Sequence, residues 1–158
     1  MDAISLRTLR EEMLDDCRVA RDAYEKAKAR FERGGDVGYE SCGHQLCRMY
    51  NAIEQMLLRV ARMFENTVED RRGWHTALVR RLSLEIKGVR PALLPADLKL
   101  PLQELRAFRH VFVHAYDLEI DPERLRLVLN YAGRIADRLS DLVETFIGKV
   151  AVQEQIEL

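Results

Sequence analysis

Residues 42–63, CGHQLCRMYNAIEQMLLRVARM, repeat apolar side chains at alternating steps of four and three residues. The positions that follow this spacing are Cys42, Leu46, Met49, Ile53, Met56, Val60 and Met63. Such steps return to the same face of an α-helix, so the segment predicts a helix with one apolar stripe. Tyr50, Leu57 and Phe64 widen that stripe, which is typical of a helix packed against more than one neighbour.

The same spacing occurs on both sides of this segment and predicts two further long helices. On the N-terminal side it joins Leu6, Leu9, Met13, Cys17, Ala20, Tyr24, Ala27 and Phe31. On the C-terminal side it joins Leu125, Val128, Ala132, Ile135, Leu139, Leu142, Phe146 and Val150. Gly34-Gly35 is expected to end the first helix, and Asp36 is expected to cap the next one.

The region between these long helices predicts two shorter ones. A third helix is expected over about residues 73–86, followed by an irregular connection over residues 87–100, which contain glycine and proline. Pro101 suits the first turn of a fourth helix. Asp121-Pro122 is a capping residue followed by a first-turn proline, so the last helix is expected to start there.

No segment alternates convincingly with the period of two that marks a β-strand. We therefore predict an all-α fold, an up-and-down antiparallel helical bundle of about five helices, three of them long. The heptad-like stripes favour shallow crossing angles between the helices. The length of 158 residues fits a single domain over residues 1–158.

Composition argues against a membrane-spanning protein and against an exported one. The chain is 47% hydrophobic and 32% charged, and no apolar run approaches the roughly 20 residues that span a bilayer. The N-terminal residues lack the pattern of a signal peptide. The three cysteines, Cys17, Cys42 and Cys47, are an odd number, which favours reduced thiols and a cytoplasmic location.

Cys42, His44 and Cys47 invite a metal-binding interpretation. Zinc usually takes four ligands at loop-type spacings, whereas these three residues are scattered around a predicted helix. Small thiols packed in the core explain the cysteines better. We predict no metal and no cofactor.

The formal net charge of −1 is unevenly distributed. Residues 71–110 hold nine basic and three acidic residues, a local charge of +6, which leaves −7 for the remainder. A solvated helix face often carries such a run. A basic surface is also what a polyanion such as RNA requires.

The basic segment leads into Arg109-His110-Val111-Phe112-Val113-His114-Ala115-Tyr116, the richest group of reactive side chains in the chain. Arginine binds phosphate as a planar, permanently charged fork. Histidine exchanges a proton near neutral pH. Together these side chains provide most of what is needed to cleave RNA without a metal.

On a straight helix each residue turns by about 100°, which sets how these side chains are arranged. His110 and His114 share a face, and Arg106 lies one turn before them. Arg109 and Tyr116 share the adjacent face if the helix persists as far as Tyr116. About 140° separates Arg109 from His114, so the two do not converge on one ideal helix. Either the helix loosens near His114, or two copies of the motif meet across a two-fold axis as a homodimer.

Two other interpretations of the motif stay open. Histidines four residues apart also form a helical metal pair, to which His75 or Asp117 would add a ligand. A histidine on a helix is also often purely structural. Four polar functional groups so close together make a structural role alone less convincing.

Arg109-His110-x3-His114-x-Tyr116 resembles the arginine–polar–x3–histidine–x–tyrosine signature of the HEPN superfamily. The longer run 106–125 and Trp74-His75 on the preceding helix look like the HepT-like branch of that superfamily. The resemblance implies an α-helical bundle that acts as the endoribonuclease toxin of a type II toxin–antitoxin system. It also implies a minimal nucleotidyltransferase (MNT) as the antitoxin, which can adenylylate the motif tyrosine, here Tyr116.

Carried onto this chain, the resemblance makes Arg109 and His114 catalytic, with His110 at the polar position after the arginine. We expect the RNA 2′-OH to attack the adjacent phosphorus, with His114 and His110 moving protons and Arg109 holding the phosphate. Arg106 and Tyr116 would bind the substrate, a tRNA or an mRNA. The alternative is a non-catalytic module that binds RNA or nucleotide and docks a partner protein, and a plain scaffold bundle is a third possibility.

Overall fold

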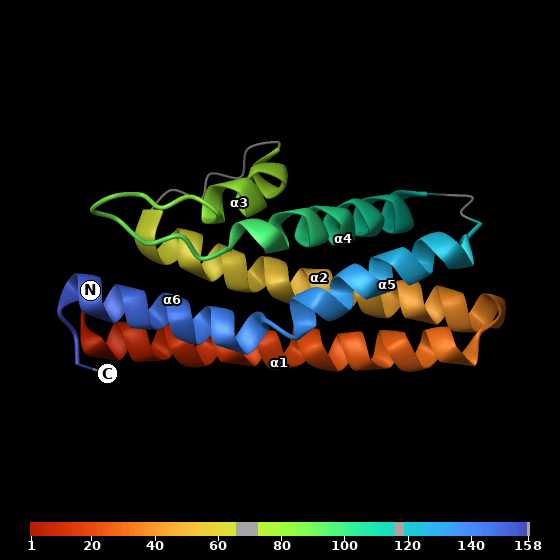
Figure 1. Ribbon diagram of the computed structural model, residues 1–158, viewed down its shortest axis with the longest axis horizontal. Helices are drawn as coiled ribbons and strands as arrows, with labels where there is room; N and C mark the ends of the chain where they lie inside the picture. Colours follow the sequence, from red (N-terminus) through yellow and green to blue (C-terminus); the bar gives the residue numbers. More distant parts are fainter. Residues whose placement is uncertain (66–72, 116–118, 158) are drawn as a thin grey trace.

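The computed structural model describes residues 1–65, 73–115 and 119–157, with only the backbone at 74–76 (Figure 1). Within these ranges the chain forms six helices and no β-strand, apart from one isolated bridge between Ile86 and Arg90. The helices are α1 (Ala3–Arg33), α2 (Gly35–Glu65), α3 (Trp74–Leu82), α4 (Ala96–His114), α5 (Pro122–Ala136) and α6 (Leu139–Glu154). The predicted all-α bundle is confirmed.

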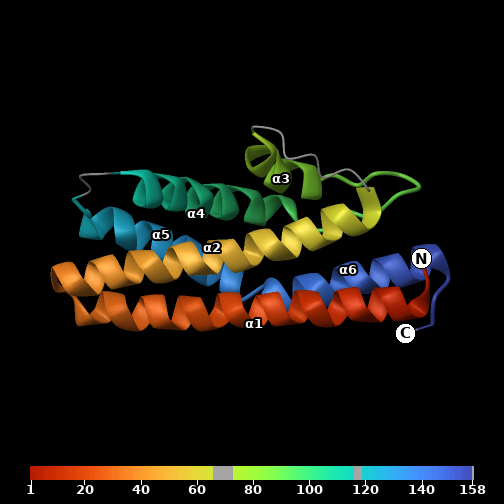
Figure 2. The same cartoon turned by 180° about the vertical axis from the view of Figure 1, so that it is seen from behind.

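The long helices α1 and α2 form an antiparallel hairpin on which the other helices pack (Figure 1). Helices α5 and α6 follow one another along α1, in the direction opposite to it, and α4 lies on α2 and α5. The view from behind shows α3 outside this group, against α2 and α4 (Figure 2). The apolar stripes expected from the sequence face inward and form one continuous core, except that Met63, at the end of the α2 stripe, is 40% exposed.

The turn between α1 and α2 depends on two glycines. Gly34 and Gly35 have φ values of 67° and 68°, a region that disfavours residues with a Cβ atom. The Gly34 N–H donates to the Phe31 carbonyl at 3.0 Å, which closes the end of α1 as expected. Helix α2 already begins at Gly35, so Asp36 lies in its first turn and is not the residue before it, contrary to our expectation.

The last predicted long helix is broken at Asp137-Arg138 into α5 and α6. The sequence pattern did not reveal this break, because the three-and-four spacing runs through it without interruption. At the break the Asp137 and Arg138 N–H groups donate to the carbonyls of Gly133 and Ile135. The Arg138 side chain also donates to Asp97 of α4 at 2.7 Å, so the turn is tied to a neighbouring helix.

The start of α4 also differs from the prediction. Helix α4 begins at Ala96, and Pro101 is buried inside it instead of lying in its first turn. Leu98, Leu102 and Leu105 are buried on the same side, so packing extends the helix in front of the proline. The third helix is shorter than predicted and ends at Leu82. At the start of α5 the Asp121 side chain accepts from the Glu123 N–H at 3.0 Å, as expected.

A fully buried arginine fastens the connection between α3 and α4 to the end of α2. Arg90 is 0% exposed and donates to one Glu65 oxygen from Nε at 2.8 Å and from Nη2 at 2.6 Å. Its guanidinium also donates to the carbonyls of Arg81, Leu84 and Pro91. A region predicted only as irregular is thus held by a buried arginine.

Among the described residues, no helix is long and apolar enough to cross a membrane. The three cysteines are free and buried, at positions that match the predicted core thiols. Burial raises the pKa of Cys17 and Cys42 to about 12. Burial also raises the pKa of Cys47, to about 11.

Candidate functional site

The motif occupies the C-terminal end of α4, which remains helical through His114. The Ala115 N–H donates to the Val111 carbonyl at 2.8 Å, so the last turn is closed. The helix therefore does not loosen before His114, one of the two arrangements that the sequence left open. Tyr116 and Asp117 lie outside the described residues, as do the side chains of Trp74 and His75.

His110 and His114 lie together on the solvent side of α4. Both residues are exposed, and their ring centroids are 4.7 Å apart with the planes tilted by 60°. The predicted shared face is thus observed. Two accessible imidazoles at this distance can accept and donate protons to one bound group, as acid–base catalysis at a phosphate requires.

Arg109 points sideways from α4 and lies against α2. Its Cζ atom is 5.8 Å from the centroid of the Tyr50 ring, within the range of a cation–π contact. Its Nε atom is buried and has no hydrogen-bond partner among the described residues. The nearby positive charge partly offsets the effect of burial on the pKa of Cys47, one turn before Tyr50 on α2.

The charges of two arginines of α4, Arg106 and Arg109, act on Tyr50. Burial raises the pKa of Tyr50 well above its ordinary value, Glu54 raises it further, and the charges of Arg106 and Arg109 lower it. Both arginines are therefore electrostatically close to the Tyr50 hydroxyl. Glu54 is itself only 6% exposed, so the α2–α4 contact contains a polar strip within an apolar core.

A close approach between α2 and α4 fixes the register of this contact. A Cβ atom placed on Gly43 would lie 2.4 Å from Cε2 of Phe112, so the ring fills the space that the glycine leaves. His44 contacts the same ring edge-on, with centroids 5.0 Å apart. Tyr50 lies about two turns beyond Gly43 on α2, and Arg109 lies about one turn before Phe112 on α4, so both pairs belong to the same antiparallel contact (Figure 1).

The structure therefore divides the predicted site residues into two groups. It brings His110 and His114 together on the exposed face, and it places Arg109 against the Tyr50 ring, with Arg106 close enough for its charge to lower the pKa of Tyr50. Sequence analysis missed Tyr50, Gly43 and His44 as neighbours of the motif. A glycine inside a helical stripe was the only signal, since it often marks a close approach.

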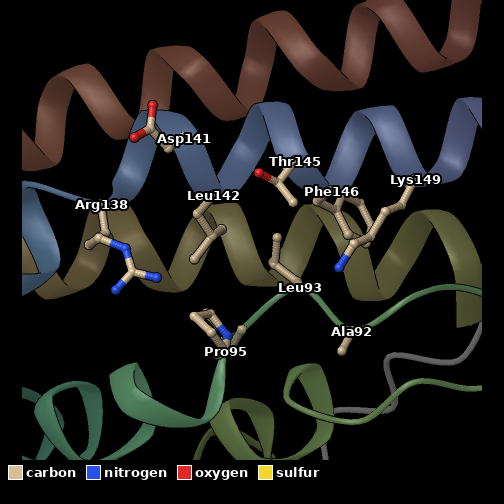
Figure 3. Close-up of a pocket in the computed structure, with 10 residues that line it drawn as sticks. Ala92, Leu93, Pro95, Arg138, Asp141, Leu142, Thr145, Phe146 and Lys149 are labelled. Carbon is tan, nitrogen blue, oxygen red and sulfur yellow. The ribbon is translucent and has the colours of Figure 1, made fainter.

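Two hollows in the surface are candidates for a site away from the histidines. One is next to the motif and is lined mainly by apolar residues of α4, α5 and the segment between them, including Phe108, Phe112, Ile120 and Leu125. The other, about 200 Å³ in volume, lies between residues 92–95 and α6, with Arg138 and Lys149 at its two ends (Figure 3). This second hollow contains no residue of the motif.

Among the described residues, no three histidines, cysteines or carboxylates form a group that could hold a metal ion.

Comparison with known proteins provides the family. The sequence model of the HepT-like protein family matches residues 41–150, more than half of the chain, from α2 into α6. The chain belongs to the HepT-like family. The match contains the whole run from Arg106 to Tyr116, so the HepT-like motif lies within the matched region. No curated protein and no solved structure matches the chain.

HepT-like proteins are part of the HEPN superfamily, whose members are generally ribonucleases. The all-α bundle of this HepT-like chain agrees with that membership. The family indicates a ribonuclease toxin of the HEPN type.

Proposed function

We propose that this HepT-like chain is a metal-independent endoribonuclease toxin of a type II toxin–antitoxin system. One observation carries the proposal: a pair of exposed imidazoles, His110 and His114, on the same helix turn as an arginine that lies against α2. Imidazoles provide acid–base chemistry, and a guanidinium provides a phosphate anchor. The family membership supports RNA as the substrate.

In the proposed reaction the 2′-oxygen of RNA forms a bond to the adjacent phosphorus, and the bond from phosphorus to the 5′-oxygen breaks. One imidazole takes the proton of the 2′-OH, and a second returns a proton to the departing 5′-oxygen. Arg109 stabilises the charge that grows on the phosphate oxygens, and Arg106 binds the neighbouring backbone. The products are a 2′,3′-cyclic phosphate and a 5′-hydroxyl.

We further propose that the active form is a homodimer. Because α4 stays helical through His114, Arg109 and His114 of one chain point in directions about 140° apart. A two-fold axis near the end of α4 would bring Arg109 of one copy to His114 of the other. Val111 and Val113, which are 51% and 58% exposed beside the histidines, provide apolar surface for this contact.

The proposed antitoxin is an MNT-type nucleotidyltransferase that adenylylates Tyr116. The proposal rests on the place of Tyr116 in the family signature. The added nucleotide would bring a bulky anion close to the motif arginine and block RNA by charge and by volume. Tyr116→Phe should escape inactivation by modification, which intact mass and growth arrest would reveal. A Tyr116→Phe toxin that the antitoxin still silences would show that binding alone is sufficient.

The first test compares wild type, His114→Ala and Arg109→Ala on tRNA and on total RNA in the presence of EDTA. Arg18→Ala, an exposed arginine on α1 outside the family match, is the matched control. We expect wild type and Arg18→Ala to cleave RNA but not DNA, and a loss of about 10²–10⁴-fold in His114→Ala. Loss of wild-type cleavage on chelation would contradict the mechanism. Binding of RNA without any cleavage would favour the non-catalytic module instead.

A further inference from the structure

The polar strip between α2 and α4 contains a tyrosine that the proposed chemistry does not use. Tyr50 is 0% exposed, and its hydroxyl has no hydrogen-bond partner among the described residues. Because this hydroxyl has no partner among those residues, the contact that Tyr50 makes with the motif is made by its ring.

The group on that ring is the motif arginine. The Arg109 Cζ atom lies 5.8 Å from the ring centroid, and its Nε atom is buried without a partner among the described residues. Within the described ranges, Arg109 forms no ion pair. The aromatic face is thus the contact that orients the guanidinium, and it leaves both terminal nitrogens available to a phosphate.

The backbone holds Tyr50 at this position. The contact of Phe112 with Gly43 holds α2 against α4 in an antiparallel arrangement, and Tyr50 lies further along that contact, where the Arg109 side chain reaches its ring. Because Tyr50 is fully buried in the middle of α2, its ring has little freedom to move. A rigid ring under a long, flexible side chain reduces the number of conformations that the side chain samples before substrate binds.

We propose that Tyr50 is a positioning residue, whose ring holds the Arg109 guanidinium in the orientation that binds the scissile phosphate. This inference rests on the proposed ribonuclease function for its catalytic consequence, but not for its geometry. The ring, and not the hydroxyl, performs the role.

The experiment compares Tyr50→Leu, which removes the ring, with Tyr50→Phe, which keeps it. We expect Tyr50→Leu to lower kcat/KM for RNA about tenfold, as loss of a desolvated cation–π contact implies, and Tyr50→Phe to recover most of that loss. Phe146→Leu, which removes an equally buried ring from α6, is the control for loss of stability alone. Phe146→Leu should lower the melting temperature without a comparable loss of kcat/KM.

A double-mutant cycle identifies the partner. In an Arg109→Ala background, Tyr50→Leu should weaken binding of a non-cleavable 2′-deoxy-substituted RNA by less than about twofold, because the group that Tyr50 orients is absent. Folded Tyr50→Leu with wild-type cleavage would overturn the inference. The inference would also be overturned if Tyr50→Leu weakened RNA binding as much in the Arg109→Ala background as it does in the wild-type background.

An NMR readout separates this inference from the proposed function. A proton above an aromatic face is shifted upfield, so the Arg109 Nε–H resonance should move on Tyr50→Leu and stay close to its wild-type position on Tyr50→Phe. An unchanged resonance in Tyr50→Leu would refute the contact. If wild type cleaves no RNA but the resonance moves as expected, the ribonuclease proposal fails and the positioning of Arg109 stands.

Discussion

Arg109 and His114 are separated by less than two helical turns, yet their surroundings differ completely. Arg109 lies on a buried ring of α2, whereas His114 is exposed beside His110. The contrast follows from the rotation of the helix, which turns one residue toward a neighbour and the other toward solvent. The arginine is therefore oriented by the protein, while the imidazoles remain accessible to a substrate.

Gly43→Ala tests how sensitive the motif is to the α2–α4 contact. The added Cβ atom would lie 2.4 Å from the Phe112 ring, so the ring or α4 must move. We expect a loss of about 1–3 kcal/mol in the free energy of unfolding, measured by chemical denaturation, together with reduced cleavage.

Gly148→Ala is the matched control, because nothing lies within 4 Å of the Cβ position on that helical glycine. It should stabilise the protein by roughly 0.5–1 kcal/mol. Destabilisation of the same size in both variants would show that the contact with Phe112 is not the cause.

The cysteines provide a pH-dependent prediction. Burial raises the pKa of Cys17 and Cys42 to about 12 and that of Cys47 to about 11, so the native thiols stay protonated at pH 8. Iodoacetamide should leave all three unmodified in the folded protein, as intact mass would show. Since the unfolded thiols ionise near pH 9, stability should fall as pH rises from about 9 toward 12. Rapid alkylation at pH 8 would contradict the burial.

At this scale the sequence predicted side-chain directions on one helix but not contacts between helices. Helical rotation placed His110 with His114 and separated Arg109 from them. The sequence could not predict the partner of Arg109, because Tyr50 lies on another helix and their contact depends on how α2 and α4 are aligned. Tyr50 was predicted only as part of a wide apolar stripe.

At the scale of the elements, the burial of apolar side chains set the helix bounds where two sequence signals disagreed. Pro101 predicted a helix start, but Leu98 and Leu102 are buried on the same side and extend α4 back to Ala96. The break at Asp137-Arg138 has no proline or glycine at its own positions and keeps the apolar spacing. By contrast, Gly34-Gly35 and Asp121-Pro122 marked boundaries correctly, because their backbone chemistry is local.

Arg90→Met tests the anchor of the connection between α3 and α4. Removing the guanidinium takes from Glu65 its buried partner, while the exposed Arg81 still pairs with that carboxylate, and it removes one donor from each of three carbonyls. We expect a loss of about 3 kcal/mol or more in the free energy of unfolding. Hydrogen exchange should accelerate in residues 83–95. Arg80→Met, an exposed arginine on α3, should change neither quantity, and equal effects in both variants would argue against the anchor.

At the scale of the whole molecule, the motif and the chain ends lie at opposite ends of the bundle. Helix α4 carries the motif to the end where α1 turns into α2, while α1 begins and α6 ends at the other (Figures 1 and 2). A dimer that shares its motif would therefore join two bundles at the α4 end. Symmetry of this kind was predicted from the 140° separation on one helix, but its interface depends on surface shape that the sequence does not reveal.

Mixing two inactive variants tests the shared site. If Arg109 of one subunit acts with His114 of the other, Arg109→Ala and His114→Ala chains should regain about a quarter of wild-type activity after exchange in equal amounts. The reason is that half of the dimers are mixed and each contains one intact pair. A mixture that stays inactive, although native mass spectrometry shows mixed dimers, would contradict the arrangement.

The neighbouring positions of the two chain ends have a practical consequence. The Met1 amino group lies 3.1 Å from a Glu154 oxygen, so a tether joined to the N-terminus leaves the surface beside the end of α6. A chain immobilised there would present the α4 end to solution in a uniform orientation. The protein can therefore be held on a sensor or an optical surface by its ends while RNA, or a second copy of the chain, approaches the histidines.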